Sequence, residues 1–237
     1  MVRYWQGYYD QGIECDDIET GGVFQDIQKR QPCVIPSDAT DPLDHLSTIL
    51  LRTTPMAPVH VGSDHYDGMW LPIRRTRVAT VATAPDDETI VDDPEPFKVG
   101  DTVQAIDVAG PATAVTDLGA ITAINYTTGL ITTTNAADSL NVNDWIEVTE
   151  NGSVDTDHFI GTEVGEARQV GLLQHPMDMR IDAKGDVQMM GGAVVIEGQI
   201  EERHIHFNVL ATNDQILIDE LEKLSPLNVH VIQRPNV

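Results

Sequence analysis

The chain of 237 residues carries 38 acidic side chains against 14 basic ones, which gives a net charge of −24. A face that neutralises phosphates needs clustered Arg and Lys, so this composition argues against binding to nucleic acid. The sequence has no apolar run of 18 or more residues and its first residues lack the apolar core of a signal peptide. We therefore expect neither a membrane-spanning helix nor secretion by that route.

The excess of acid also bears on the solvent in which the chain folds. Self-repulsion at this charge opposes a compact state, and salt at about 1 M screens it because the Debye length falls to roughly 3 Å. Only four of the basic residues are lysines. Acid excess with scarce lysine resembles the proteins of extreme halophiles; the alternative is simply an acidic surface.

Residues 1–36 are polar and lack periodicity, yet they hold more than a third of the aromatic side chains. Such rings favour an extended N-terminal arm that packs on its own body or on a neighbouring subunit, the alternative being an irregular segment over the chain's own core. The expected assembly contacts are Tyr4, Trp5, Tyr8, Tyr9 and Phe24. Cys15 and Cys33 can form one disulfide or remain buried thiols.

A short helix is expected next. Asp41 can act as its N-cap with Pro42 in the first turn, and an apolar face follows until Thr53-Thr54-Pro55 ends it. That face consists of Leu43, Leu46, Ile49 and Leu50. The loop after it contains Asp64, His65 and Asp67, which suggest a cation site but lack the spacing of a calcium loop, so turn chemistry explains them.

Residues 73–83 read as a strand that contains the only cluster of basic residues, Arg74, Arg75 and Arg77. We expect these arginines to pair with acidic neighbours within the protein or across an interface. The run from Asp86 to Pro96 is acidic and closed by proline, which is typical of a solvated face, with divalent-ion binding as the less favoured reading.

Residues 97–148 give the clearest pattern, a small β-barrel of about five strands. The segment opens with a Gly-Asp turn at Phe97–Asp101 and closes on a near copy at Leu140–Asp144, where Asn143 stands in place of Gly100. Gly and Asn both tolerate a left-handed backbone, so the two segments are expected to make the same turn. Between them, Thr127-Thr128-Gly129 predicts the turn of a β-hairpin.

After residue 150 the pattern changes to glycine-separated strands in residues 166–173 and 185–200, followed by a second short helix. A capping box, Thr212-Asn213-Asp214-Gln215, begins this helix, and a last strand covers residues 227–232. The helix has an apolar stripe of Leu217, Leu221 and Leu224. The predicted fold class is therefore mainly β, with barrel or sandwich modules, two short helices and an extended N-terminal arm.

Catalytic signatures do not occur: there is no phosphate-binding loop, dinucleotide motif or nucleophile elbow. The best metal candidate is His204-Ile205-His206, with Glu202 on the same face and His230 on a later strand. Two histidines do not close a site, and alternation with buried Ile205 and Phe207 explains the segment as an ordinary strand. We therefore expect no metal, no cofactor and no catalytic residue.

The order of elements near the C-terminus resembles that of head decoration proteins, which stabilise the capsids of tailed viruses. The resemblance lies in the strand Ala167–Leu173, then Ala193–Glu202 with its G-x-I-x-E ending at Glu202, a helix, and the strand Asn228–Val231. The opening F-x-V-G-D of the barrel, Phe97 to Asp101, resembles a β module common in virion structural proteins of such viruses. The N-terminal 70 residues and the inserted barrel depart from the compact decoration proteins.

The resemblance implies a non-enzymatic subunit on the surface of an icosahedral virion, made in the host cytoplasm and bound to the major capsid protein. It implies a homo-oligomer, most plausibly a trimer, and the acid excess suggests a virus of a halophilic archaeon. The expected organisation is an arm with one helix (1–70), a β-rich body (71–96 and 151–237) and an inserted barrel (97–150) that projects outward, where it can meet a host surface. The alternatives are another virion subunit, such as a major capsid or tail component, and an acidic halophilic enzyme or carbohydrate-binding module.

Overall fold

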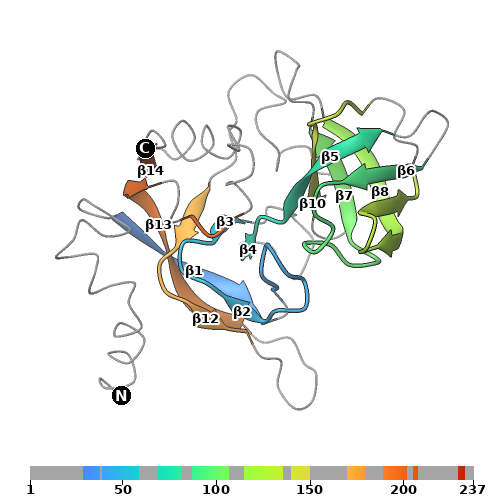
Figure 1. Cartoon of the computed structure of the whole chain (residues 1–237). Helices are drawn as coiled ribbons and strands as arrows, with labels where there is room; N and C mark the ends of the chain where they lie inside the picture. The colour runs from blue at the N-terminus through green and yellow to red at the C-terminus, as the bar shows by residue number, and fades with distance from the viewer. Residues whose placement is uncertain are drawn as a thin grey trace.

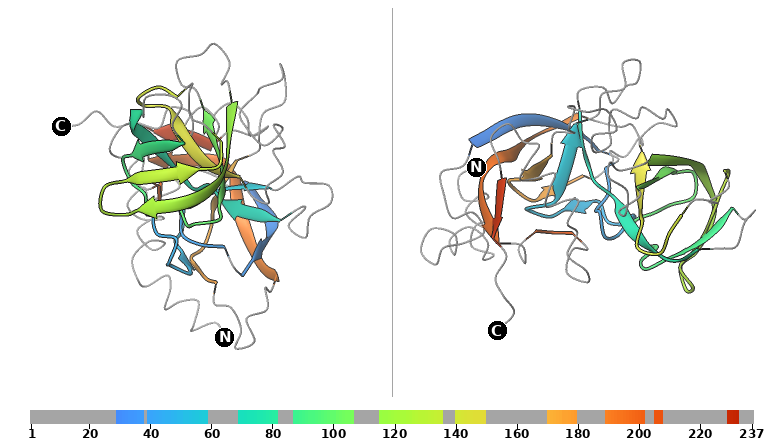
Figure 2. Two further views of the ribbon diagram at one scale, coloured as in Figure 1. Left: turned by 90° about the vertical axis from the view of Figure 1, so that its right-hand side faces the viewer. Right: turned by 90° about the horizontal axis from the view of Figure 1, so that it is seen from above.

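The computed structural model describes residues 29–37, 39–58, 69–81, 87–106, 115–135, 140–149, 170–179, 189–201, 205–207 and 229–232. Within these residues the chain forms strands and no helix. The strands make an open sheet, a closed barrel beside it and a small two-stranded ribbon (Figures 1 and 2). The prediction of a mainly β chain with a barrel is thus confirmed.

The open sheet has six strands in the order β1-β13-β11-β3-β4, with β14 parallel to the end of β13. Its strands are β1 (Lys29–Pro36), β3 (Pro55–Pro58), β4 (Trp70–Pro72), β11 (Gly171–Leu173), β13 (Met189–Glu201) and β14 (Val229–Ile232). The ribbon pairs β2 (Ile49–Leu50) with β12 (Met177–Asp178). Strand β13 is the centre of the sheet because it pairs with β1, β11 and β14.

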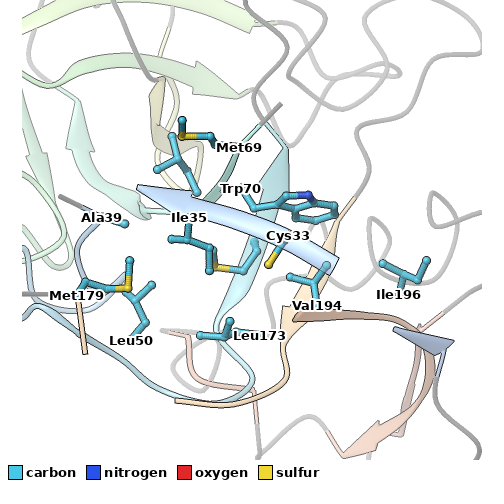
Figure 3. Packing of buried hydrophobic residues seen from close by; sticks show 12 residues of the cluster. Cys33, Ile35, Ala39, Leu50, Met69, Trp70, Leu173, Met179, Val194 and Ile196 are labelled. Atoms are coloured by element: carbon cyan, nitrogen blue, oxygen red, sulfur yellow. The ribbon is translucent and has the colours of Figure 1, made fainter. Parts of the chain in front are cut away.

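Apolar residues cover both faces of this sheet, which explains the uninterrupted apolar run in β13. Val194 and Ile196 pack on one face with Cys33, Ile35 and Trp70 (Figure 3). Val195, which points the other way, joins a second cluster together with Ile73, Val170, Leu172, Ile200, Ile205 and Phe207. A strand buried on both sides reads as continuous rather than alternating hydrophobicity. Cys33 is a free thiol, and burial raises its pKa to about 11.

The barrel has six strands in the closed order β10-β5-β6-β9-β8-β7. They are β5 (Arg75–Val81), β6 (Glu88–Val91), β7 (Thr102–Ile106), β8 (Val115–Asn125), β9 (Leu130–Thr133) and β10 (Trp145–Thr149). Closure removes exposed strand edges, and ten buried side chains fill the interior, among them Phe97, Leu118, Ile131 and Ile146. The predicted hairpin is confirmed: β8 and β9 flank residues 127–129, and Gly129 has a φ of 73°.

The two copies of the turn are the same at the level of hydrogen bonds. In the first, Lys98 N donates to Asp101 Oδ2 (2.8 Å) and Asp101 N donates to Lys98 O (3.1 Å). In the second, Asn141 N donates to Asp144 Oδ2 (2.7 Å) and Asp144 N donates to Asn141 O (3.1 Å). Gly100 and Asn143, with φ values of 98° and 78°, occupy the same place. The prediction of one shared turn is confirmed.

The match extends to the whole barrel, whose second half repeats the first 43 positions later along the chain. Ile121 N donates to Asp101 O and Val78 N donates to Asp144 O, both at 2.8 Å. The β5–β6 ladder is irregular directly after Val78, and the β8–β9 ladder is irregular directly after Ile121. The barrel is therefore an internal duplication, β5-β6-turn-β7 and β8-β9-turn-β10, related by a pseudo-two-fold axis between β7 and β10.

The helix predicted from Asp41 does not form. Asp41 Oδ1 accepts a hydrogen bond from Leu43 N, and Asp44 Oδ1 accepts one from Leu46 N, both at 2.9 Å. The first bond is one that a helix N-cap also makes, but the backbone closes two separate turns instead, with Asp44 N donating to Asp41 O and Ser47 N donating to Asp44 O. The bond at Asp44 gives the backbone an alternative to the helical pattern. The segment then enters β2 instead. The second predicted helix, at 212–224, lies outside the described residues.

The expected boundaries also need correction. Strands β5 and β6 belong to the barrel, so it begins near residue 75 rather than 97, and the acidic run expected as a solvated face contains the barrel strand β6. Strands β1, β2 and β3 lie in the body, so residues 29–58 are not part of an arm. Local pattern did not reveal this because closure of a barrel depends on partners far apart in the sequence.

Candidate functional site

Three segments from distant parts of the sequence meet at one end of the barrel. The loop 41–47 contacts the β6–β7 connection, since the backbone N of His45 and its ring Nδ1 both lie within hydrogen-bond distance of Glu95 O, at 3.0 and 2.7 Å. The β8–β9 turn joins them through Tyr126, whose hydroxyl donates to Phe97 O at 2.9 Å. We call this place the barrel–loop junction.

The centre of the junction is a stacked pair of rings. The ring centroids of His45 and Tyr126 are 5.2 Å apart and their planes differ by 11°. His45 Nε2 lies 3.2 Å from the Tyr126 hydroxyl, so the two side chains also make a hydrogen bond. Burial, and then the negative charges of Glu95 and Asp101, raise the pKa of Tyr126. Its hydroxyl therefore keeps its proton at neutral pH.

Exposed apolar side chains occur on the segments that form this junction and on β6 beside it. Leu46 follows His45 and is 77% exposed, and Val99, 60% exposed, stands at the tip of the turn that follows Phe97. Ile90 of β6 and Tyr126 of the β8–β9 turn are also partly exposed, and the bond from Val91 N to Gly129 O joins β6 to that turn. We call the set Leu46, Ile90, Val99 and Tyr126 the barrel-end surface. Exposed aliphatic groups gathered at one place are typical of protein-docking sites.

The backbone beneath this surface is held firmly. Arg74 binds Asp101 through both terminal nitrogens, at 3.0 and 3.1 Å, and also donates to Pro96 O. Both charged groups of this pair are buried. Because Asp101 closes the turn that carries Val99, the ion pair fixes the position of the exposed valine. Little conformational entropy is lost when such a preorganised surface binds a partner.

Two arginines of the cluster pair with acidic side chains as expected, and they do so within the chain: Arg74 pairs with Asp101 and Arg75 with Glu147. Sequence reasoning missed the part played by aromatic rings. The fully buried guanidinium of Arg75 lies 5.2 Å from the Trp145 ring of the barrel and 5.4 Å from the Phe207 ring of the sheet core. Arg75 therefore links the barrel to the sheet, and its partners were hidden by their distance in sequence.

The described residues offer only a weak candidate for metal binding. Atoms of Asp44, His45 and Glu95 that can bind a metal lie within 4.8 Å of one another, but both His45 nitrogens make hydrogen bonds. Of the histidines predicted as a metal candidate, His206 contacts Asp41, with Nε2 lying 2.7 Å from Oδ2, while His204 and the side chain of His230 lie outside the described part. Ile205 and Phe207 are buried as expected, although residues 205–207 form a bend.

The predicted assembly contacts Tyr4, Trp5, Tyr8, Tyr9 and Phe24 all lie outside the described residues, as do Asp64, His65 and Asp67. Among the described residues there is no helix of the length and apolarity needed to cross a membrane. Comparison of the chain with protein-family models, with curated protein sequences and with solved structures finds no match. The functional argument therefore depends on the junction, the surface around it and the resemblance in the sequence.

Proposed function

We propose that this chain is a non-enzymatic virion protein that decorates and stabilises an icosahedral capsid, and that the barrel-end surface is one of its docking sites. The observation that carries the proposal is the exposure of Leu46, next to the His45–Glu95 contact, and of Val99, on a turn fixed by the Arg74–Asp101 pair. A rigid apolar surface of this kind suits a partner that is itself rigid, such as a capsid shell. The resemblance to decoration proteins points to the same partner.

The charge of the chain supports an apolar mode of docking. A surface with a net charge of −24 is repelled by an equally acidic shell, and concentrated salt screens that repulsion. Salts that are excluded from protein surfaces strengthen the burial of apolar groups. An acidic protein in concentrated salt is therefore best held by contacts such as those of Leu46, Val99 and Ile90.

Co-sedimentation of the purified protein with empty capsid shells in concentrated salt tests the proposal. Leu46→Asp and Val99→Asp should each weaken binding by tenfold or more, because a central apolar contact is worth more than about 1 kcal/mol. Val142→Asp is the matched control: Val142 is 54% exposed and occupies the equivalent turn, but at the opposite end of the barrel. Loss of binding in Val142→Asp alone, or in none of the three, contradicts docking through the barrel-end surface.

In the alternative arrangement, the barrel projects outward from the capsid and the barrel-end surface contacts the host. In that case Leu46→Asp and Val99→Asp bind shells normally and fail instead to attach virions to host cells. The aromatic residues of the N-terminus would then supply the shell contact. A deletion that tests this must end before Lys29, because β1 pairs with β13 and buries Ile35.

Two further parts of the proposal concern assembly and solvent. We propose a symmetric homo-oligomer, most plausibly a trimer, because a decoration subunit gains avidity when several weak contacts act together. Analytical ultracentrifugation tests this, and a strict monomer at all concentrations opposes it. We also propose a halophilic source. The melting temperature should then rise markedly between about 0.1 M and 2 M salt as the repulsion is screened, and a flat curve argues against it.

A further inference from the structure

The first strand of the open sheet contains prolines at alternate positions of its ladder. β1 lies at one end of the order β1-β13-β11-β3-β4 and, among the described strands, pairs only with β13. Its register with β13 runs without a break through Pro32 and Pro36. A proline has no backbone N–H, so the donors that β1 gives to this continuous ladder come from the residues between the prolines, which are Gln31, Cys33 and Ile35.

The backbone groups of the intervening residues therefore point away from β13. In an antiparallel pair, residues that bond to the partner strand alternate with residues that do not, so Pro32, Val34 and Pro36 face the outer edge. Of these three, only Val34 has an N–H. The carbonyl of Pro36 already accepts a bond from Ala39 N at 3.1 Å. The outer edge of β1 thus offers a single donor between its two prolines.

The strand at the other end of the sheet follows the same rule. In β4, Leu71 lies opposite Ala57 of β3, and the next residue but one, Ile73, donates its N–H to Pro55 O at 3.0 Å. Leu71 and Ile73 therefore face β3. Pro72 lies between them, so its missing N–H belongs to the outer edge of β4.

We infer that the prolines of β1 block the addition of a strand from a second copy of this chain. Pro32 is exposed, Val34 is 39% exposed, and no charged residue occurs from residue 31 to residue 37. An uncharged, apolar strand edge is a template for pairing between molecules. Lysine protects many such edges by its charge, which concentrated salt screens, whereas a missing N–H protects the edge at any ionic strength. Copies of this chain then meet through side chains, without extending the sheet at β1.

Amide hydrogen exchange of the full chain, followed by nuclear magnetic resonance, tests the direction of the backbone groups. The amides of Cys33 and Ile35 should exchange slowly. The amide of Val34 between them should exchange at least about tenfold faster, which is the difference expected for one hydrogen bond. Equal protection of all three amides overturns the assignment of the outer edge.

A matched pair of variants tests the blocking itself. Pro32→Val adds a second outward N–H, and sedimentation velocity in about 2 M salt should show species that grow with protein concentration. The control exchanges the two residues, Pro32→Val with Val34→Pro, which keeps the composition and a single outward N–H. It should sediment as the wild type does. If Pro32→Val also sediments as the wild type, or if both variants associate, the prolines do not block strand addition.

Thermal denaturation checks that the control itself folds. Val34→Pro alone should change the melting temperature by less than about 2 °C, because its N–H makes no ladder bond. Gly191 lies opposite Val34, and a Cβ at Gly191 would meet no atom within 4 Å, so the proline ring has room. Cys33→Pro removes a ladder donor and should melt about 5 °C or more below Cys33→Ala. A loss in Val34→Pro as large as that in Cys33→Pro contradicts the inference.

Discussion

The two halves of the barrel share a backbone but differ in the side chains of two equivalent strand pairs. In the β5–β10 pair, Glu147 lies opposite Arg75 and Trp145 lies opposite Arg77. In the equivalent β7–β8 pair, Thr102 lies opposite Ala120. The ladder then shifts by one residue, so that Gln104 lies opposite Asp117 and the buried Leu118 has no residue opposite it on β7. The β5–β10 pair contacts the core of the open sheet, because the Arg75 guanidinium lies against the ring of Phe207.

The comparison shows which features of a duplicated barrel are fixed by local chemistry. Both turns keep the aspartate that accepts from the backbone and the residue with positive φ, because without them neither turn closes. The side chains differ where the β5–β10 pair contacts Phe207 through Arg75. Gln104 and Glu147 express this most directly, since they are equivalent positions that face each other across the pseudo-two-fold axis.

The largest effect should come from making these two positions alike. Glu147→Gln removes the carboxylate that lies 3.2 Å from the fully buried guanidinium of Arg75. We expect a loss of about 3–5 kcal/mol in the free energy of unfolding, because the change removes the negative partner of a buried ion pair. Urea denaturation at fixed salt measures this. Glu88→Gln, at an exposed position of β6, should change stability by less than about 0.5 kcal/mol, and equal effects of the two changes would contradict the comparison.

A smaller loss should follow from a side chain at the irregular point of β8. Gly119 has a φ of 71°, and a Cβ there would lie 2.0 Å from the Thr134 hydroxyl oxygen. Gly119→Ala should therefore reduce the free energy of unfolding by about 1–3 kcal/mol. Gly191→Ala is the control, since a Cβ at Gly191 meets no atom within 4 Å. If both substitutions are neutral, the irregularity in β8 does not depend on glycine.

Gln104 should respond in the opposite direction to Glu147. Its side chain is fully buried, and neither amide atom has a hydrogen-bond partner among the residues that the structure describes. Gln104→Leu should raise the free energy of unfolding by about 1 kcal/mol, because it removes an unsatisfied polar group. Gln104→Glu should be destabilising instead, since it places a second carboxylate directly opposite Glu147. A loss of stability in Gln104→Leu would mean that the amide has a role that its contacts do not reveal.

The smallest effect should come from exchanging the residues at the two turns. Gly100→Asn and Asn143→Gly, made together, should change the free energy of unfolding by less than about 1 kcal/mol, because both residues tolerate positive φ. Gly100 also has room for a side chain, as a Cβ there meets no atom within 4 Å. Gly129→Asn is the contrasting variant: its Cβ would lie 2.4 Å from Val91 O, so thermal denaturation should show a clear loss.

The sequence by itself determined the features that depend on a few neighbouring residues. The turn at Phe97–Asp101, its copy at Leu140–Asp144 and the hairpin around Gly129 were all readable, because positive φ and a closing aspartate are local requirements. Charge alone also indicated that the arginines pair with acidic side chains, but the choice between pairs within the chain and pairs across an interface came from the structure. The predicted helix at Asp41 was wrong for an equally local reason: Asp41 and Asp44 each accept a hydrogen bond from the backbone N two residues later, in a segment that forms turns.

Only the tertiary structure decided which strands close the barrel and which side chains meet at its end. β5 and β6 pair with β10 and β9, from the other half of the barrel, and no short pattern encodes such a partner. The junction has the same origin, because His45 and Tyr126 are 81 residues apart. Contacts of this kind depend on the register of the whole barrel, so a sequence shows the residues that take part but not which of them will touch.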